Sequence, residues 1–175
     1  SDVLASFAGL PHRIEYVGEI DARRFYNDAK STTPAATMAA LSALDGNVWL
    51  VAGGHSKGAD FGELAEVIVS RSRGAALYGA AGCEFRSAIS QRTSALALTT
   101  VATLDAAVHW CWKRSRPGDA ILLSPACASH DQFVDYRHRG QTFRSVVQRI
   151  RSQSLSADAR HHVADAPLAT NRTLD

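Results

Sequence analysis

Short apolar runs alternate with amphipathic stretches along most of the chain. Residues 48–52 form a continuous apolar run, as does the segment 120–123, and both are typical of strands buried on two faces. In the stretch 103–114 the apolar residues recur at helical spacing and share one face. This alternation predicts an α/β fold with a mostly parallel sheet that is covered by helices on both faces.

The pattern places each element at a definite segment. Strands are expected at residues 14–20, 23–27, 48–52, 75–78, 95–99 and 120–123, and helices at 35–44, 60–70, 82–91, 103–114 and 141–151. The first two strands meet at Asp21-Ala22, which indicates a hairpin at one edge of the sheet. Residues 153–175 lack a clear pattern, so we expect a flexible tail there after a domain that spans residues 1–152.

Polar or glycine-rich loops follow three of the expected strands and begin at Asp28, Gly53 and Ser124. Ligands of parallel sheets collect at the carboxyl ends of the strands. We therefore expect these three loops to meet at one edge of the sheet and to form a binding site there.

The loop Gly53-Gly-His-Ser-Lys-Gly58 lies where a phosphate-binding loop would lie, but it does not have that motif. The motif requires a glycine directly before the lysine and a hydroxyl residue after it, whereas Ser56 and Gly58 occupy these positions. Lys57 remains a candidate for binding a carboxylate or phosphate. The alternative is a solvated loop lysine.

The loop Asp28-Ala-Lys-Ser-Thr-Thr-Pro34 places Lys30 and several hydroxyl groups directly before a helix, whose free N–H groups favour an anion. Ordinary helix capping by the threonines is the alternative. In the third loop the residues from Ser124 to Ser129 are small, so backbone amides are accessible to a ligand. Ser129 has no G-x-S-x-G sequence around it, which favours a hydrogen-bonding role over a nucleophilic one.

Composition and charge exclude several classes of function. The 175 residues fit one domain, and the net charge of +2, with basic and acidic residues interleaved, argues against nucleic-acid binding. Sixteen of the nineteen basic residues are Arg, so the rare lysines at 30 and 57 are notable in loops. No apolar run approaches 18 residues and no signal peptide is recognisable, so we expect a cytoplasmic chain without membrane contact.

Cysteine and histidine spacing predicts neither a disulfide framework nor a metal site. The relevant residues are Cys83, Cys111 and Cys127, together with His130, His138, His161 and His162. Trp110 and Trp112 are expected in the core of a helix. The chain begins at Ser1 without an initiator Met, which suggests a processed chain or a piece of a longer one.

Four segments resemble, in order and spacing, the C-terminal domain of the Mur ligases. They are Pro11-His-Arg-Ile-Glu15, Phe25-Tyr-Asn-Asp-Ala-Lys-Ser-Thr32, Gly53-Gly-His-Ser-Lys-Gly-Ala-Asp-Phe61 and Ser124-Pro-Ala-Cys-Ala-Ser-His-Asp-Gln-Phe133. The last segment is similar to that of the D-glutamate-adding members. The resemblance implies a Rossmann-like, three-layer domain of a three-domain cytoplasmic enzyme of peptidoglycan synthesis.

The resemblance also implies a reaction and a set of partners. ATP with Mg²⁺, held mainly by a central domain of the same polypeptide, would phosphorylate UDP-N-acetylmuramoyl-L-alanine, and D-glutamate would attack the acyl phosphate. By position, the D-glutamate site would contain Thr32, Lys57, Ser129 and Tyr136, with Lys30 nearby. Arg13 and Asp28 would contact ATP, and His12 and Lys30 would lie near the reaction centre without acting as catalysts alone.

Three positions depart from the family pattern. His55 stands where an Asp is common, Thr33 where Asn is usual, and Tyr136 where Phe is usual. Nothing in the chain corresponds to the UDP-binding or ATP-binding domains, so the chain alone is not expected to be active. Two alternatives remain open: a diverged stand-alone binding module with the same fold, and a Mur-type domain for another amino acid.

Overall fold

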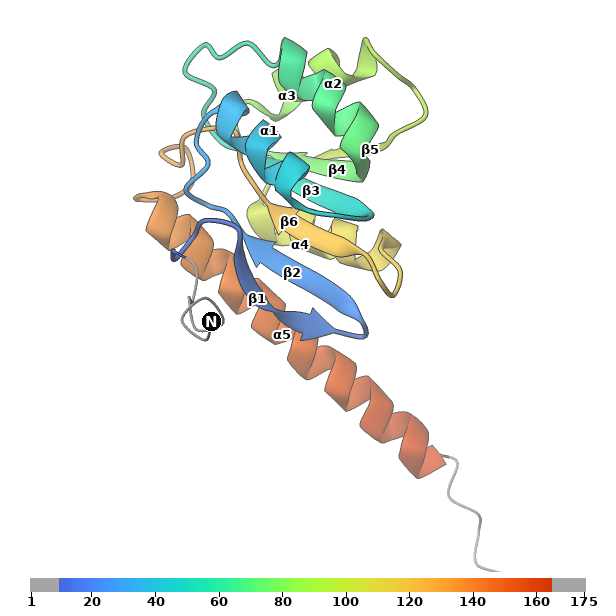
Figure 1. Ribbon diagram of the computed structural model, residues 1–175. Coiled ribbons are helices and arrows are strands. Elements are labelled where there is room, and N and C mark those ends of the chain that lie inside the picture. Colours follow the sequence, from blue (N-terminus) through green and yellow to red (C-terminus); the bar gives the residue numbers. More distant parts are fainter. Residues whose placement is uncertain (1–9, 165–175) are drawn as a thin grey trace, which may run out of the picture.

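A computed structural model describes residues 10–164 as a three-layer α/β domain (Figure 1). Its strands are β1 (Glu15–Ile20), β2 (Arg23–Asn27), β3 (Val48–Gly53), β4 (Ser72–Tyr78), β5 (Ala97–Val101) and β6 (Ala120–Leu123). Its helices are α1 (Pro34–Ala43), α2 (Gly62–Arg71), α3 (Gly82–Ser90), α4 (Leu104–Arg114) and α5 (Tyr136–Ala164). The strand order is β1-β2-β6-β3-β4-β5. β1 pairs antiparallel with β2 at the edge, and every other pairing in the described sheet is parallel, which confirms the predicted fold class.

Each face of the sheet is covered by its own set of helices. One core contains Leu41 of α1, Leu64 of α2 and Phe85 of α3, packed on strand residues such as Leu50. The other contains Val108 of α4 and Phe143 of α5. Successive strand side chains point to opposite faces, so the continuous apolar runs supply both cores.

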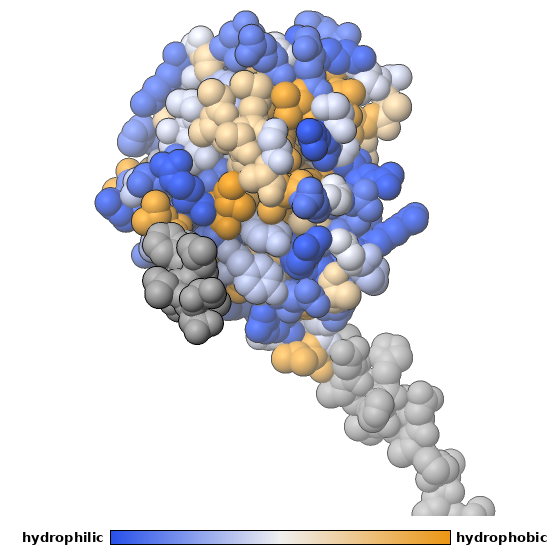
Figure 2. All heavy atoms as spheres, in the orientation of Figure 1, coloured by the Kyte–Doolittle hydropathy of each residue, from blue (hydrophilic) through white to orange (hydrophobic). Residues whose placement is uncertain are grey.

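The surface in the orientation of Figure 1 is mostly hydrophilic (Figure 2). An apolar area lies over α1, whose exposed side chains include Ala35, Ala39 and Ala43. Alanine favours the helix without adding a large apolar group to the surface.

Two strands differ in extent from the prediction. β4 begins at Ser72 rather than at residue 75, and β5 is shifted two residues toward the C-terminus. Gly74, which interrupts the apolar pattern, lies against the indole of Trp49 in β3. A Cβ atom at residue 74 would be 2.6 Å from Cζ3 of Trp49. The glycine therefore accommodates a neighbouring ring and does not end the strand.

The last helix is longer than predicted at both ends. It begins at Tyr136, before Gly140, and continues to Ala164, through part of the segment expected to be a tail. Gly140 costs a helix about 1 kcal/mol relative to Ala, but its missing side chain leaves room for the ring of His12. The rest of the tail expected at residues 153–175, which is residues 165–175, lies outside the described residues, as do the side chains of His161 and His162.

Candidate functional site

Backbone hydrogen bonds join the three predicted loops at the carboxyl edge of the sheet. His55 and Ala128 exchange two bonds of 3.0 Å, which pair the loop after β3 with the loop after β6. The N–H of Ala126 donates to the carbonyl of Ser31 at 3.0 Å and thereby attaches the loop after β2. The expected meeting of the loops is confirmed, and we call this edge the loop edge.

A fourth loop, residues 79–81, also lies at the loop edge. The N–H of Ala81 donates to the carbonyl of Gly54 at 2.8 Å, and the carboxylate of Asp131 accepts the N–H of Ala80 at 3.0 Å. Sequence analysis did not assign this loop. The signal was present in its small residues and in its position directly after β4.

Lys57 lies at the exposed tip of the loop after β3. It has a φ of 52° and is followed by Gly58 with a φ of 74°, so a tight left-handed turn carries it away from the strand. Its ammonium group has no hydrogen-bond or ion-pair partner within residues 10–164. It is two residues from His55, whose backbone is bonded to Ala128, the neighbour of Ser129. The turn therefore places Lys57 and Ser129 on loops that are joined at the loop edge.

Ser129 and Thr32 differ in exposure. Ser129 is only 3% exposed, and its hydroxyl has no partner in the described part of the chain. Thr32 is exposed, while the neighbouring Thr33 caps α1 by accepting the N–H of Ala36 at 3.4 Å. Capping thus explains Thr33, and the hydroxyls of Thr32 and Ser129 remain available for a ligand.

Lys30, Tyr136 and His12 lie together beside the loop edge. The Lys30 ammonium is 5.9 Å from the centroid of the Tyr136 ring, within the range of a cation–π contact. The His12 and Tyr136 rings meet edge to face with centroids 5.9 Å apart. The start of α5 therefore connects two of the segments that sequence analysis selected.

Hydrogen bonding defines the tautomer of His12. The Asn27 amide donates to Nδ1 at 3.0 Å, so Nδ1 acts as an acceptor and the ring proton is on Nε2. Burial lowers the pKa of His12, and the charge of Arg144 acts in the same direction, against the opposing charge of Glu15. The structure thus favours a neutral imidazole at this position.

Asp28 lies in the interior at 1% exposure. Its carboxylate accepts the Ser124 hydroxyl at 2.7 Å and the N–H of Ile14 at 3.2 Å. Burial raises the pKa of Asp28 in spite of these bonds and the nearby charge of Arg13. Its visible role is to hold the segment that carries the exposed Arg13, and direct contact with a nucleotide stays a prediction.

Arg139, which sequence analysis did not select, links the loops from below. Its side chain is fully buried, and its guanidinium donates at 3.0 Å to the carbonyls of both Ala29 and Cys127. It forms no ion pair with a carboxylate among the described residues. The two terminal nitrogens of the guanidinium are bonded to carbonyls, whereas Nε has no partner in the described part of the chain. The two bonds hold the cation in place, because the guanidinium and each bonded carbonyl would otherwise lose a partner. Arg139 therefore fixes the loop after β2 relative to the loop after β6.

Within residues 10–164, no group of three or more His, Cys, Asp or Glu side chains is arranged to hold a metal ion. In the same range no helix combines the length and apolarity needed to cross a membrane.

Taken together, fold and loop edge define a class: a three-layer α/β domain that carries ammonium and hydroxyl groups on joined loops at the carboxyl ends of its parallel strands. A family model described as Mur ligase, glutamate ligase domain, matches residues 12–127. The chain belongs to the Mur ligase family.

Named relatives and solved structures agree with this membership. The chain is 42% identical over 142 residues to the UDP-N-acetylmuramoylalanine--D-glutamate ligase of Solibacter usitatus. This alignment covers 81% of this chain and 31% of the relative. The ligase of the same name from Aromatoleum aromaticum is 46% identical over 148 residues, covering 84% of this chain and 31% of the relative. The chain therefore spans about a third of the length of the curated relatives it matches.

The structural likeness is to other Mur ligases at low identity. UDP-N-acetylmuramate-alanine ligase MurC from Thermotoga maritima aligns with a TM-score of 0.58 and 13% identity, over 84% of this chain and 31% of that one. MurF ligase from the same organism, solved in complex with ADP, aligns with a TM-score of 0.54 and 16% identity, over 89% of this chain and 34% of that one. These two likenesses support the fold.

Proposed function

We propose that this chain is the amino-acid-binding domain of an ATP-dependent ligase that adds D-glutamate to UDP-N-acetylmuramoyl-L-alanine in peptidoglycan synthesis. The observation that carries the proposal is the joining of the Lys57, Thr32 and Ser129 loops by backbone hydrogen bonds. The name shared by relatives at 42% and 46% identity supports the choice of amino acid. We place the reaction in the cytoplasm.

D-Glutamate carries two carboxylates, so its site requires two separate anion-binding groups. In the proposal Lys57 and Thr32 hold the α-carboxylate, with Lys30 nearby. Ser129 and Tyr136 hold the side-chain carboxylate. The small residues of this loop do not offer the free amides expected from the sequence, because the N–H groups of Ser124, Ala126 and Ala128 donate to carbonyls of the domain itself. This grip orients the amine of D-glutamate toward the activated substrate, so that positioning supplies catalysis.

ATP and Mg²⁺ would be held mainly by the central domain of the complete ligase. ATP supplies the phosphoryl group that activates the carboxylate of the nucleotide-linked L-alanine. In this chain the exposed Arg13 suits contact with a phosphate, and Asp28 fixes its segment through Ile14. The neutral, buried ring of His12 lies beside the same region, and its hydrogen bond to Asn27 holds it in place.

The test is a titration of the chain with D-glutamate that is monitored by NMR. The backbone signals of Thr32, Lys57 and Ser129 should shift, and L-glutamate at equal concentration should bind more weakly. Lys57→Ala should weaken binding at least about tenfold, because a charge-assisted hydrogen bond is lost. Lys113→Ala is the matched control, since Lys113 is an exposed lysine on α4. Unchanged spectra at millimolar D-glutamate would overturn the assignment of the site.

His55 favours a second candidate, a stand-alone ligand-binding module with the same fold. This residue is exposed beside Lys57 and replaces an acid that is common in the family pattern. The ligase proposal would be supported if the gene also encodes a phosphate-binding loop upstream of Ser1 and the complete protein has ligase activity. D-Glutamate binding by a chain with no such upstream loop would support the second candidate.

A further inference from the structure

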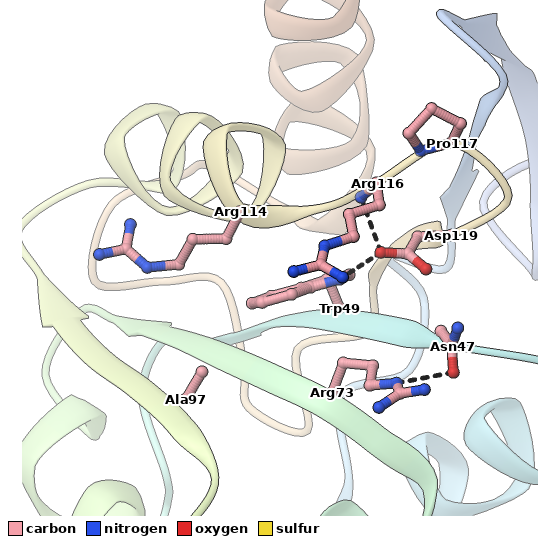
Figure 3. Close-up of a pocket in the computed structure, with 8 residues that line it drawn as sticks. All are labelled: Asn47, Trp49, Arg73, Ala97, Arg114, Arg116, Pro117 and Asp119. Carbon is pink, nitrogen blue, oxygen red and sulfur yellow. Dashed lines mark hydrogen bonds between the residues drawn. The ribbon is translucent and has the colours of Figure 1, made fainter.

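A pocket of about 530 Å³ lies at the edge of the sheet opposite the loop edge (Figure 3). Its lining residues belong to the beginnings of β3, β4 and β5, to the residue before β3, or to the segment from the end of α4 to the start of β6. They are Asn47, Trp49, Arg73, Ala97, Arg114, Arg116, Pro117 and Asp119. The loop edge follows the other ends of the same strands, at Gly53, Tyr78 and Leu123. The two regions are therefore separated by the length of the sheet.

Positive charge dominates this pocket. Arg73, Arg114 and Arg116 line it with one acid, Asp119. Asp119 is only 6% exposed, and its Oδ2 accepts the indole N–H of Trp49 at 2.9 Å and the backbone N–H of Arg116 at 2.8 Å. This carboxylate is committed to the wall of the pocket and forms no ion pair with the three guanidinium groups.

Uncharged neighbours orient two of the arginines. Nε of Arg73 donates to the side-chain carbonyl of Asn47 at 2.7 Å, which leaves the outer nitrogens of its guanidinium without a partner among residues 10–164. The guanidinium of Arg114 lies 4.2 Å from the centroid of the Trp110 ring, which in turn meets Trp49 edge to face at 5.8 Å. These contacts hold the side chains in place and do not neutralise their charges.

The wall of the pocket combines these cations with an apolar surface. Figure 3 shows Arg114 and Arg116 on the α4 side, Arg73 on the β4 side, and the indole of Trp49 between them. Like charges around one cavity repel each other unless an anion binds. A guanidinium presents a planar pair of donors that matches a phosphate, and three of them exceed what a single carboxylate requires.

We propose that this pocket is a second ligand site, which binds a phosphorylated small molecule of about nucleotide size. The volume lies within the usual range for small-molecule sites. The arginines bind the phosphoryl groups, and Trp49 contacts a planar or apolar part of the ligand. This site is independent of the D-glutamate site and of the function proposed for it.

The experiment is a titration with inorganic pyrophosphate at constant ionic strength, monitored through the NMR signal of the Trp49 indole N–H. This signal should shift and saturate, while sodium sulfate at equal ionic strength should shift it less. The double variant Arg73→Gln/Arg114→Gln should weaken binding at least about tenfold. The control Arg86→Gln/Arg92→Gln removes the same charge from α3 and the residues after it, and should bind within about twofold of the unchanged chain.

ADP and adenosine identify the source of the phosphate. Tighter binding of ADP than of pyrophosphate, with no binding of adenosine, indicates a nucleotide, whereas equal binding of ADP and pyrophosphate indicates another phosphorylated compound. Three results would overturn the proposal: no saturable shift, equal weakening in both double variants, or shifts confined to Lys57 and Ser129. Tighter binding of an acidic peptide would also overturn it and would identify a protein-docking surface instead.

Discussion

Arg139 shows how one side chain can determine the geometry of a site that it does not enter. It is fully buried, and its two bonds reach the carbonyls of Ala29 and Cys127, on loops far apart in the sequence. Tyr78 is also fully buried, and the charge of Arg139 acts on it, although burial dominates and raises the pKa of the tyrosine. The Arg139 guanidinium and the Tyr78 side chain thus lie together in the interior beneath the loop edge.

Replacing Arg139 with Met should lower the free energy of unfolding by about 3 kcal/mol, because two carbonyl groups lose a charged partner. Urea unfolding measures this change. Arg137→Met is the control, because Arg137 is exposed two residues away and should change stability by less than about 0.5 kcal/mol. Equal stability of the two variants would contradict the linking role of Arg139.

The pKa of His12 predicts a dependence of stability on pH. Burial and the charge of Arg144 hold this pKa below its usual value of 6.5 in the folded chain. The unfolded chain therefore binds a proton more readily, and the contribution of His12 to stability is lost as the pH falls from 6.5 through the folded pKa. His12→Gln should reduce the fall in unfolding free energy between pH 7 and pH 5.

Comparing the unfolding free energy at pH 7 and pH 5 separates the titration of His12 from the contribution of its packing. His12→Gln also lowers stability at neutral pH, but only the change with pH reports the titration of the ring. Asp28, whose pKa is raised by burial, contributes equally to both chains and cancels in the difference. Identical profiles for the unchanged chain and His12→Gln would contradict the assignment.

The sequence predicted which helices and strands exist, and their order, better than it predicted the residues at which they begin and end. Apolar periodicity depends on burial, and burial is set by the two cores, so every strand and helix in residues 10–164 was expected. The beginnings of β4 and α5 were misplaced because Gly74 and Gly140 interrupt the pattern. Both glycines make room for a ring from another element, and this tertiary cause is not visible in a local pattern.

Gly140→Ala tests this interpretation, because two effects oppose each other. Alanine should favour α5 by about 1 kcal/mol through helix propensity. Its Cβ would overlap Nδ1 of His12, and overpacking typically costs 1–3 kcal/mol. We expect net destabilisation by about 1 kcal/mol in thermal or urea unfolding. In a His12→Ala chain the same substitution should be stabilising, and destabilisation there would contradict the steric explanation.

The sequence predicted which loops form the candidate site, but it did not predict the buried residue that holds these loops together. Loops after parallel strands meet at one edge for topological reasons, so the positions of Lys57 and Ser129 followed from sequence. Arg139 lies on a helix far along the chain, and its bonds to backbone carbonyls have no sequence signature. The loop after β4 lacks charged residues, so only its small residues and its position after a strand could have indicated it.

The whole molecule presents two different edges of one sheet. D-Glutamate at the loop edge and pyrophosphate at the arginine pocket would contact opposite ends of the same strands. Distant sites with no shared partners usually act additively. At tenfold excess over Kd, each ligand should stabilise the fold by about 1.4 kcal/mol, and both together by about 2.8 kcal/mol.

Thermal unfolding with each ligand and with both measures this additivity. Failure of one ligand to stabilise the chain would count against that site alone, so the two proposals are tested separately. A combined effect much larger or smaller than the sum would show that the sheet couples its two edges.

The paired backbone bonds between His55 and Ala128 have a consequence for evolution. The hydrogen bonds given for His55 involve only its main-chain atoms, so its side chain can vary without displacing Lys57, two residues away. Single substitutions at residue 55 can therefore change the charge near Lys57 while the scaffold stays intact. An Asp in place of His55 would be accepted by the same backbone.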